Sequence, residues 1–218
     1  MTRNVNLSQW TEKYRAKTLD ELVVSSRIKE IGYKIIESGQ LQNLLLVGGH
    51  GVGKTSFAEI LIDSLDVHAL TAKTRGMDDI RSLYEINSIT SVLGSKYIAF
   101  IDEADMLLAA VQKEMLKSLE GYKTGIQASI LIANDVSRIH EGIRSRTIEI
   151  DFEIRDYEKI EVGKLMLERV LFILDSQDVS YSEKWVVNMV KGFYESKGYD
   201  IRNFINELQS KVNRHNVL

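Results

Sequence analysis

The feature that most constrains this chain is an apolar run that leads into a glycine-rich turn and then into an amphipathic stretch. Residues 44–49 read LLLVGG, and residues 48–55 read GGHGVGKT, which fits the pattern G-x-x-x-x-G-K-[ST]. In residues 54–65 the apolar side chains recur at helical spacing. A strand, a glycine loop and a helix in this order let backbone N–H groups converge on phosphate oxygens beside a helix N-terminus. The alternative is a glycine-rich turn with an incidental lysine, which the flanking strand and helix disfavour.

This loop predicts a nucleotide site with Mg²⁺. Lys54 is expected to reach the β- and γ-phosphates, and the Thr55 hydroxyl is expected to be a ligand of the metal ion. The loop residues expected to contact the nucleotide are Gly48, Gly49, His50, Gly51, Val52, Gly53, Lys54, Thr55 and Ser56.

A second apolar run ends in acidic residues. Residues 97–105 read YIAFIDEAD, so a buried strand would carry Asp102 to its end, where the carboxylate can join the Mg²⁺ shell. Glu103 is then placed to polarise the attacking water as a general base. Two helix-capping acids are the alternative, which the phosphate loop earlier in the chain disfavours. Asp105 is expected to cap the helix that follows.

Two polar groups stay ambiguous when their residues are considered alone. Asn134 follows the apolar run SILIA and can either orient the lytic water or form a turn with Asp135. Lys73, Arg75 and Arg81 can meet nucleic-acid phosphates or form a solvated helix face beside neighbouring aspartates.

Hydrophobic periodicity predicts an α/β fold with a parallel five-stranded sheet covered by helices on both faces. The expected strands are 44–49, 67–71, 97–105, 129–133 and 147–152, and the helices among them are 25–37, 54–65, 77–90 and 109–121. Three helices without intervening strands follow, at 156–175, 181–193 and 200–213. We therefore expect a nucleotide-binding domain over residues 1–153 and a small all-helical lid domain over 154–218.

Composition excludes several classes of protein. The chain has no cysteine, so disulfides and cysteine-ligated zinc are excluded, and its four histidines lack metal-ligand spacing. Its apolar runs are too short for a membrane span, and residues 1–10 lack the apolar core of a signal peptide. We expect a protein that is not secreted and is cytoplasmic, or nuclear in a eukaryote. The net charge of −3 leaves room only for a local basic patch. There is no proline, which adds entropy to the unfolded chain.

These motifs, in this order, resemble the small ATPase subunits of sliding-clamp loaders, the replication factor C small subunits and their phage counterparts in the AAA+ class. The resemblance covers essentially all 218 residues. WTEKYRAKTLDELV resembles the EKYRPKTLDD box that lines the family's adenine pocket, which implies that Tyr14 and Arg15 contact the nucleotide. GGHGVGKTS corresponds to the Walker A segment and IDEAD to Walker B.

The resemblance also implies roles for residues outside these two motifs. Asn134 corresponds to sensor 1, and Arg202, in YDIRNFINELQ, to the sensor 2 arginine on the γ-phosphate. Arg146 stands in Ser145-Arg146-Thr147, where the family has an SRC box, and would act in trans on a neighbouring subunit's nucleotide. Gln112 corresponds to a glutamine that couples adjacent subunits.

TRGMDDIR matches the family's DNA-facing RGIDxxR segment. This match implies DNA contacts by Arg75 and Arg81, joined by Lys73 and Lys117.

The implied protein is an ATP hydrolase that opens a sliding clamp and places it on primer–template DNA, with hydrolysis completed in trans. Its cofactors would be ATP and Mg²⁺. Its partners would be the clamp, the DNA and other loader subunits in a ring or spiral, a pentamer where a collar is present, with no membrane. The family's helical collar domain is expected to be absent, because the sequence stops at NRHNVL.

Departures from the family leave the chemistry in place. Non-proline residues occupy positions where the family usually has proline, at Ala16, Gln42, Gly49, His50 and Gly142, and Thr147 replaces the cysteine of the SRC box. A helicase-loader or initiator-type AAA+ ATPase that remodels DNA is the alternative, and RGMDDIR together with SRT favours the clamp loader. An inactive subunit that only binds nucleotide is disfavoured by Glu103.

Overall fold

The computed structural model describes residues 9–72, 75–84, 96–120 and 126–215. The strands are β1 Leu44–Val47, β2 His68–Thr71, β3 Tyr97–Ile101, β4 Ile126–Ala133 and β5 Ile148–Asp151. The α-helices are α1 Trp10–Lys13, α2 Ser26–Ser38, α3 Lys54–Ser64, α4 Met77–Tyr84, α5 Ala109–Leu119, α6 Glu141–Arg144, α7 Lys159–Ser176, α8 Glu183–Lys197 and α9 Ile201–His215. Short 3-10 turns lie at η2 Ala104–Met106, η3 Val136–Arg138 and η4 Asp156–Glu158.

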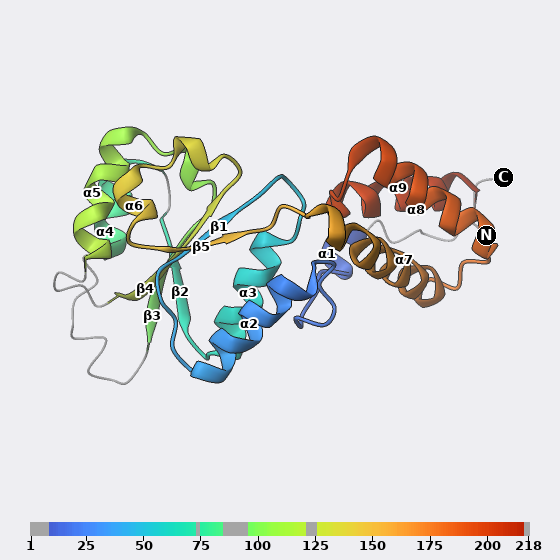
Figure 1. Cartoon of the computed structure of the whole chain (residues 1–218), viewed down its shortest axis with the longest axis horizontal. Coiled ribbons are helices and arrows are strands. Elements are labelled where there is room, and N and C mark those ends of the chain that lie inside the picture. Colours follow the sequence, from blue (N-terminus) through green and yellow to red (C-terminus); the bar gives the residue numbers. More distant parts are fainter. Residues whose placement is uncertain (1–8, 73–74, 85–95, 121–125, 216–218) are drawn as a thin grey trace, which may run out of the picture.

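The five strands form one parallel sheet in the order β2-β3-β4-β1-β5 (Figure 1). This confirms the predicted fold class. β1 lies between β4 and β5, with Leu44 paired to both Ile130 and Ile148. The carboxyl ends of β1, β3 and β4 therefore lie together at one edge of the sheet, and the amino ends of β1 and β5 lie at the opposite edge.

Alternate residues of each strand build two separate hydrophobic layers, as the period of two in a strand requires. Leu44 and Leu46 point to the layer that contains Ile28 of α2 and Phe57 of α3. Leu45 and Val47 point to the other layer, where α4, α5 and α6 pack. Helices thus cover both faces, as Figure 1 shows.

The three C-terminal helices pack around a third hydrophobic cluster of their own. Trp10 of α1 and Tyr14 just after it belong to this cluster, although they lie at the other end of the sequence. The Trp10 backbone N–H also donates to Gln209 Oε1 of α9 at 3.1 Å. The beginning of the described chain is therefore part of the helical layer that α7, α8 and α9 form.

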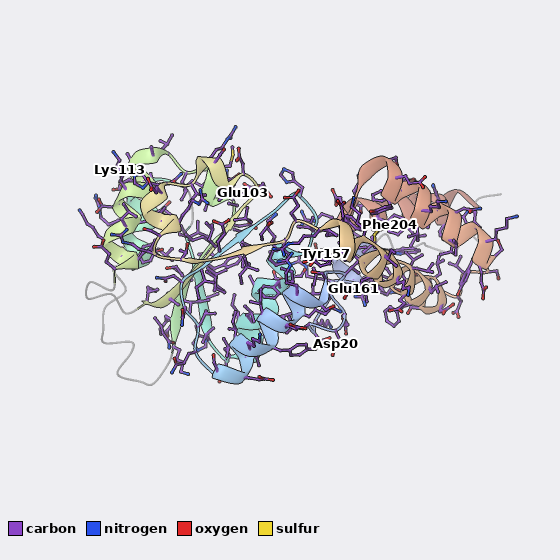
Figure 2. All side chains as sticks on the ribbon, viewed as in Figure 1. Asp20, Glu103, Lys113, Tyr157, Glu161 and Phe204 are labelled. Carbon is purple, nitrogen blue, oxygen red and sulfur yellow. The ribbon has the colours of Figure 1, made fainter. Side chains whose placement is uncertain are left out.

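A polar network joins the sheet to the helical part where β5 leads into η4. Arg27 of α2 donates from Nε to Glu158 Oε1 at 2.9 Å and from Nη1 to the Asp151 carbonyl at 3.0 Å. Ser26 donates to the Glu161 carboxylate. Figure 2 shows Tyr157 and Glu161 at this passage and Phe204 within the helical part. The amino end of α2 is thereby tied to the start of α7.

The predicted elements agree with the structure apart from their ends. The strand expected at 129–133 already begins at Ile126, and the helix expected at 77–90 is described only over α4, because 85–90 lie outside the described residues. Residue 121, the expected end of another helix, also lies outside them.

Candidate functional site

A cavity lies at the carboxyl edge of the sheet and extends to the helical part. The predicted nucleotide residues that line it are Tyr14, Arg15, His50, Gly51, Val52, Gly53, Lys54, Thr55, Ser56, Asp102, Glu103, Asn134 and Arg202. The fold therefore brings together side chains that lie far apart in the sequence, from Tyr14 to Arg202.

The loop between β1 and α3 has the backbone shape that the glycine pattern predicts. Gly48 has a φ of +147°, and a Cβ at this position would lie 2.9 Å from the Cβ of Phe152. A side chain is therefore excluded where the loop leaves the sheet, which explains glycine at this position. α3 begins at Lys54, so the N–H groups of its first turn face the cavity without helical partners.

Lys54 is buried, at 6% exposure, and holds the loop together from inside. Its Nζ donates to the carbonyl oxygens of Gly48 at 2.7 Å and Gly49 at 2.6 Å and to Asn134 Oδ1 at 2.9 Å. Burial lowers the pKa of Lys54 from 10.5 to about 8, although Asp102 and Asp105 oppose the shift. An anion bound nearby would raise this pKa again, because it stabilises the charged form of the ammonium group.

Asp102 and Thr55 provide hard oxygen atoms at the wall of the same cavity. The Asp102 side chain is exposed, and its Oδ1 accepts a hydrogen bond from the Glu103 N–H at 2.8 Å. Across the described ranges no group of three or more histidine, aspartate or glutamate side chains could hold a metal ion. One carboxylate and one hydroxyl fit Mg²⁺, which usually takes few protein ligands and completes its shell with waters and substrate phosphates.

Glu103 directly follows Asp102 and has a left-handed backbone, with φ +54° and ψ +46°. This conformation is uncommon for a residue with a side chain and costs on the order of 1 kcal/mol. Backbone strain of this kind is concentrated at functional sites. The Glu103 carboxylate forms an ion pair with the guanidinium of Arg75, just before α4. The predicted general base therefore contacts a residue that we had expected to face DNA.

Asn134 and Asp105 lie beside each other where β4 ends. Asn134 accepts from Lys54, as given above, and the backbone N–H of Asp135 donates to Asp105 Oδ2 at 3.2 Å. The prediction that Asp105 caps the next helix is wrong, because Leu108 is the N-cap of α5. Asp105 is buried at 8% exposure, and Oδ1 has no hydrogen-bond partner within the described part of the chain. It holds the loop that carries Asn134 instead.

Tyr14 and Arg15 approach the cavity from the N-terminal segment. Arg15 Nη1 contacts both Glu59 oxygens of α3, at 2.6 and 2.7 Å. The Tyr14 hydroxyl accepts from Gln177, and its carbonyl accepts from Arg169 Nη2 at 2.7 Å. The segment thus bridges the phosphate loop's helix and the helical part.

Arg169 of α7 was not predicted, although it lines the cavity. Burial lowers its pKa, and Glu21 forms an ion pair with it at 3.6 Å. The sequence offered one signal for Arg169, which is its position between the apolar residues Met166 and Val170 on a helix. A charged side chain beside the apolar face of a helix is usually paired with an opposite charge or a ligand.

Arg146 lies far from this cavity along the strands. It precedes β5, whose first residue, Ile148, pairs with Leu44 at the amino end of β1. Arg146 is exposed, and its guanidinium contacts the Glu120 carboxylate and the Gly142 carbonyl, the latter at 2.9 Å. With a rise of about 3.3 Å per residue, the strand between them separates Arg146 from its own phosphate loop by well over 10 Å.

Gln112 is buried at 3% exposure, so its side chain does not itself present a contact surface. Its Nε2 donates to the Leu107 carbonyl at 3.1 Å and to the Arg138 carbonyl at 3.0 Å, and its Oε1 accepts from the His140 N–H at 2.7 Å. The predicted role of Gln112 in coupling adjacent subunits stays a prediction. Within the chain, Gln112 fixes the segment that leads to α6 and Arg146.

The predicted DNA residues divide into two groups. Arg81 and Lys117 approach one carboxylate, Glu114, at 3.3 and 3.5 Å. Arg75 contacts Glu103 beside the cavity, as described above. Lys73 lies outside the described residues.

Within the residues that the structure describes, no helix combines the length and the apolar character needed to cross a membrane.

Comparison with known proteins identifies the family. The profile of the ATPase family associated with various cellular activities (AAA) matches residues 44–155. Replication factor C small subunit 2 of Pyrobaculum arsenaticum is 29% identical, over 92% of this chain and 62% of the relative. The replication factor C small subunit of Archaeoglobus fulgidus is 31% identical, over 94% of this chain and 64% of the relative. The chain thus spans about three fifths of the length of these relatives.

Solved structures show the same fold. RuvB of Thermotoga maritima superposes with a TM-score of 0.73 at 20% identity, over 92% of this chain and 65% of that one. The resemblance to clamp-loader ATPase subunits that the motifs carry is confirmed by the replication factor C relatives. From the match over residues 44–155, this chain belongs to the AAA family of ATPases.

Proposed function

We propose that this chain is an ATPase subunit of a sliding-clamp loader, which uses ATP binding and hydrolysis to open a clamp and place it on primer–template DNA. Similarity to replication factor C small subunits over more than nine tenths of the chain supports the proposal. The cavity independently supports the ATP-binding part of the proposal, because the hydrogen-bond donors that line it suit a nucleoside triphosphate.

We assign roles in ATP binding to the predicted nucleotide residues. The loop Gly48–Ser56 surrounds the phosphates, and Lys54 exchanges its carbonyl partners for phosphate oxygens. Thr55 and Asp102 hold Mg²⁺, which neutralises phosphate charge when bound. Tyr14 and Arg15, which line the cavity from the N-terminal segment, would contact the base.

Hydrolysis requires a base for the attacking water and positive charge near the γ-phosphate. Glu103 is the base, Asn134 orients the water, and Arg202 contacts the γ-phosphate. Arg75 restrains Glu103 through their ion pair. A DNA phosphate that attracts Arg75 would free the Glu103 carboxylate, so DNA binding would raise the rate of hydrolysis.

The proposal that a neighbouring subunit completes the site rests on the position of Arg146. Because Arg146 lies at the amino edge of the sheet and the cavity lies at the carboxyl edge, one chain cannot bring them together. We infer that Arg146 completes the site of a neighbouring subunit, where an added arginine accelerates phosphoryl transfer on the order of 10³-fold or more.

The remaining roles follow from this arrangement. Arg75, Arg81 and Lys117, together with Lys73, follow the DNA backbone, while Gln112 stabilises the segment that presents Arg146. We infer that residues 1–153 form the nucleotide-binding domain and 154–218 the lid that closes over the nucleotide, with Trp10 and Tyr14 packed against the helices of the lid.

Subunit mixing tests the trans assignment. Lys54→Ala subunits, which lack a competent site, are combined with Arg146→Ala subunits in the complete assembly with companion subunits, clamp and DNA, and phosphate release is measured. We expect the mixture to regain hydrolysis that neither variant shows alone, because a Lys54→Ala subunit supplies Arg146 to the intact site of an Arg146→Ala neighbour. Arg144→Ala is the matched control, because Arg144 is a nearby exposed arginine paired with Glu149. A defect confined to the site of the mutated subunit would contradict the trans role.

A clamp-binding assay separates a clamp loader from a DNA-remodelling ATPase of the helicase-loader type. The assembly is incubated with its cognate clamp and an ATP analogue, and the mass of the complex is measured with and without primed DNA. We expect a complex with the clamp that requires the ATP analogue. An assembly that binds ATP and DNA but not the clamp would contradict the clamp-loader function.

A further inference from the structure

Asp200 lies where the helical part meets the phosphate loop. It directly precedes α9, and its Oδ1 accepts a hydrogen bond from the Asn203 N–H at 2.9 Å. Its carbonyl accepts from the Phe204 N–H at 3.0 Å. The Asp200 side chain therefore satisfies one of the free donors in the first turn of α9, as an aspartate cap does.

The same carboxylate lies against Gly51 in the phosphate loop. A Cβ at Gly51 would collide with Asp200 Oδ1 and Cγ, and the three heavy atoms nearest to that position all belong to Asp200. Gly51 also has a φ of +69°, which disfavours a side chain. The cap of α9 thus occupies the space that a Gly51 side chain would fill.

This contact determines where Arg202 lies. Arg202 is in the first turn of α9, two residues after Asp200, which corresponds to a rise of about 3 Å along the helix. Arg202 lines the nucleotide cavity together with Ile201 and Ile205. A helix whose first turn rests on the phosphate loop holds Arg202 at a set distance from any phosphate bound there.

Arg202 and Lys54 line the same cavity, one from the helical part and one from the phosphate loop. An anion bound between two cations stabilises both of them. A phosphate bound in this cavity would therefore lie near Arg202 as well as Lys54.

We propose that Asp200 is a positioning residue that docks α9 on Gly51 and thereby places Arg202 at the γ-phosphate. The inference rests on the proposed role of Arg202. It assigns to Asp200 the discrimination between ATP and ADP, because only ATP carries the phosphate that Arg202 would contact. Asp200 itself touches no substrate atom.

The test measures the ratio of ADP to ATP-analogue dissociation constants for the full chain, by calorimetry with Mg²⁺ and a non-hydrolysable analogue. Asp200→Ser keeps a capping hydroxyl but lacks the carboxylate oxygen that lies nearest to Gly51. Asp200→Asn keeps both the cap and the shape. Ser182→Ala removes a different cap in the same helical part, since Ser182 caps α8 through the Trp185 N–H.

We expect Asp200→Ser to weaken binding of the ATP analogue by about tenfold, near the lower end for a hydrogen bond to a charged group, with ADP binding unchanged. Asp200→Asn should restore the wild-type ratio, and Ser182→Ala should leave the ratio unchanged. If Asp200→Ser weakens both nucleotides equally, Asp200 shapes the phosphate loop and the inference is wrong. An unchanged ratio in Asp200→Ser also overturns it.

Arg202→Ala separates this inference from the proposed function. If Arg202→Ala lowers the preference for the ATP analogue and Asp200→Ser does not, only the positioning role is wrong. If Arg202→Ala has no effect on the preference, the role of Arg202 is wrong and the inference fails with it. In the double variant Arg202→Ala/Asp200→Ser, we expect no loss beyond that of Arg202→Ala alone, because Asp200 acts through Arg202.

Discussion

The guanidinium of Arg75 forms an ion pair with the carboxylate of Glu103, so the base of the proposed reaction contacts a residue of the proposed DNA surface. Both side chains are about half exposed, at 51% and 45%, and a pair this exposed is weak and easily broken. A phosphate that approaches Arg75 can therefore compete with Glu103 for it.

Replacing Arg75 with alanine should uncouple hydrolysis from DNA. In the complete assembly we expect Arg75→Ala to raise the rate of ATP hydrolysis without DNA on the order of severalfold, because Arg75 no longer holds the Glu103 carboxylate away from the attacking water. We also expect it to reduce the further stimulation of hydrolysis by primed DNA. Steady-state phosphate release with and without DNA measures both effects. Arg81→Ala is the control, since it removes a DNA contact without touching Glu103. A lower DNA-independent rate in Arg75→Ala would contradict the restraint.

Nucleotide affinity should depend on pH through Lys54. The folded chain lowers the pKa of this ammonium from 10.5 to about 8, mainly by burial, so between these values the folded protein binds fewer protons than the unfolded chain. This group therefore makes folding more favourable as pH rises through that window. Bound phosphates favour the charged form, so we expect nucleotide affinity to be level below pH 8 and to fall above it by up to about tenfold per pH unit.

Calorimetry at pH 7 and pH 9, in buffers of different ionisation enthalpy, measures this effect as proton uptake on binding at pH 9. Lys54→Met should bind weakly at both values and take up no proton. Equal proton uptake by the wild type and Lys54→Met would assign the titration to another group.

Glu114 should weaken DNA binding by neutralising Arg81 and Lys117. Its carboxylate lies 3.3 Å from Arg81 Nε and 3.5 Å from Lys117 Nζ, so both cations leave a partner when they contact phosphate. We expect Glu114→Gln to tighten DNA binding by about threefold at low salt, which corresponds to the free energy of an exposed ion pair. The affinity should also depend more steeply on salt concentration. Fluorescence anisotropy over a salt series measures both changes. Glu149→Gln frees a different arginine, Arg144, and should have no effect.

The pair between Arg27 and Glu158 should stabilise the junction of the two parts of the chain. Glu158 is 2% exposed and accepts from both Arg27 Nε and the Arg155 N–H, each at 2.9 Å. We expect Glu158→Gln to lower the free energy of unfolding by about 2 kcal/mol, because it leaves a partly buried guanidinium without its counter-charge. Urea unfolding measures the loss, and Glu153→Gln, at an exposed position nearby, should be neutral.

The same variant gives a pH test. Burial opposes ionisation of Glu158, but Arg27 and the donor groups around it outweigh burial and lower its pKa below 4.5. A carboxylate with a lowered folded pKa contributes its full stability above pH 4.5 and loses it as pH falls further. The difference between the wild type and Glu158→Gln should therefore shrink below pH 4.5. A constant difference down to pH 3 would contradict the assignment.

Features that depend on near neighbours in the sequence were predictable. The loop between β1 and α3, the apolar run of β1 and the acids after β3 depend on residues a few positions apart, and the structure has these elements where they were expected. The parallel sheet also followed, because alternating strands and helices allow few other arrangements. Local patterns were enough to predict which segments line the cavity.

Contacts between distant segments were not predictable. Gln112 lies on a helix whose pattern does not show that the carbonyl of Arg138 and the N–H of His140 reach its side chain. Asp105 looks like a helix cap until β4 places the Asp135 N–H beside it. The packing of Tyr14 with α7 likewise depends on the whole fold.

The separation of Arg146 from the cavity has a consequence for how copies of such a chain can associate. An interface that brings Arg146 of one chain to the cavity of another, without the reciprocal contact, joins two unlike surfaces and is heterologous, in contrast to the self-complementary interface of a twofold dimer. Repetition of a heterologous contact gives a closed ring or an open helical arc, depending on the rotation per step. In an open arc the subunit at one end offers its arginine to no neighbour and the subunit at the other end receives none, so the two terminal positions differ chemically even when their sequences are the same.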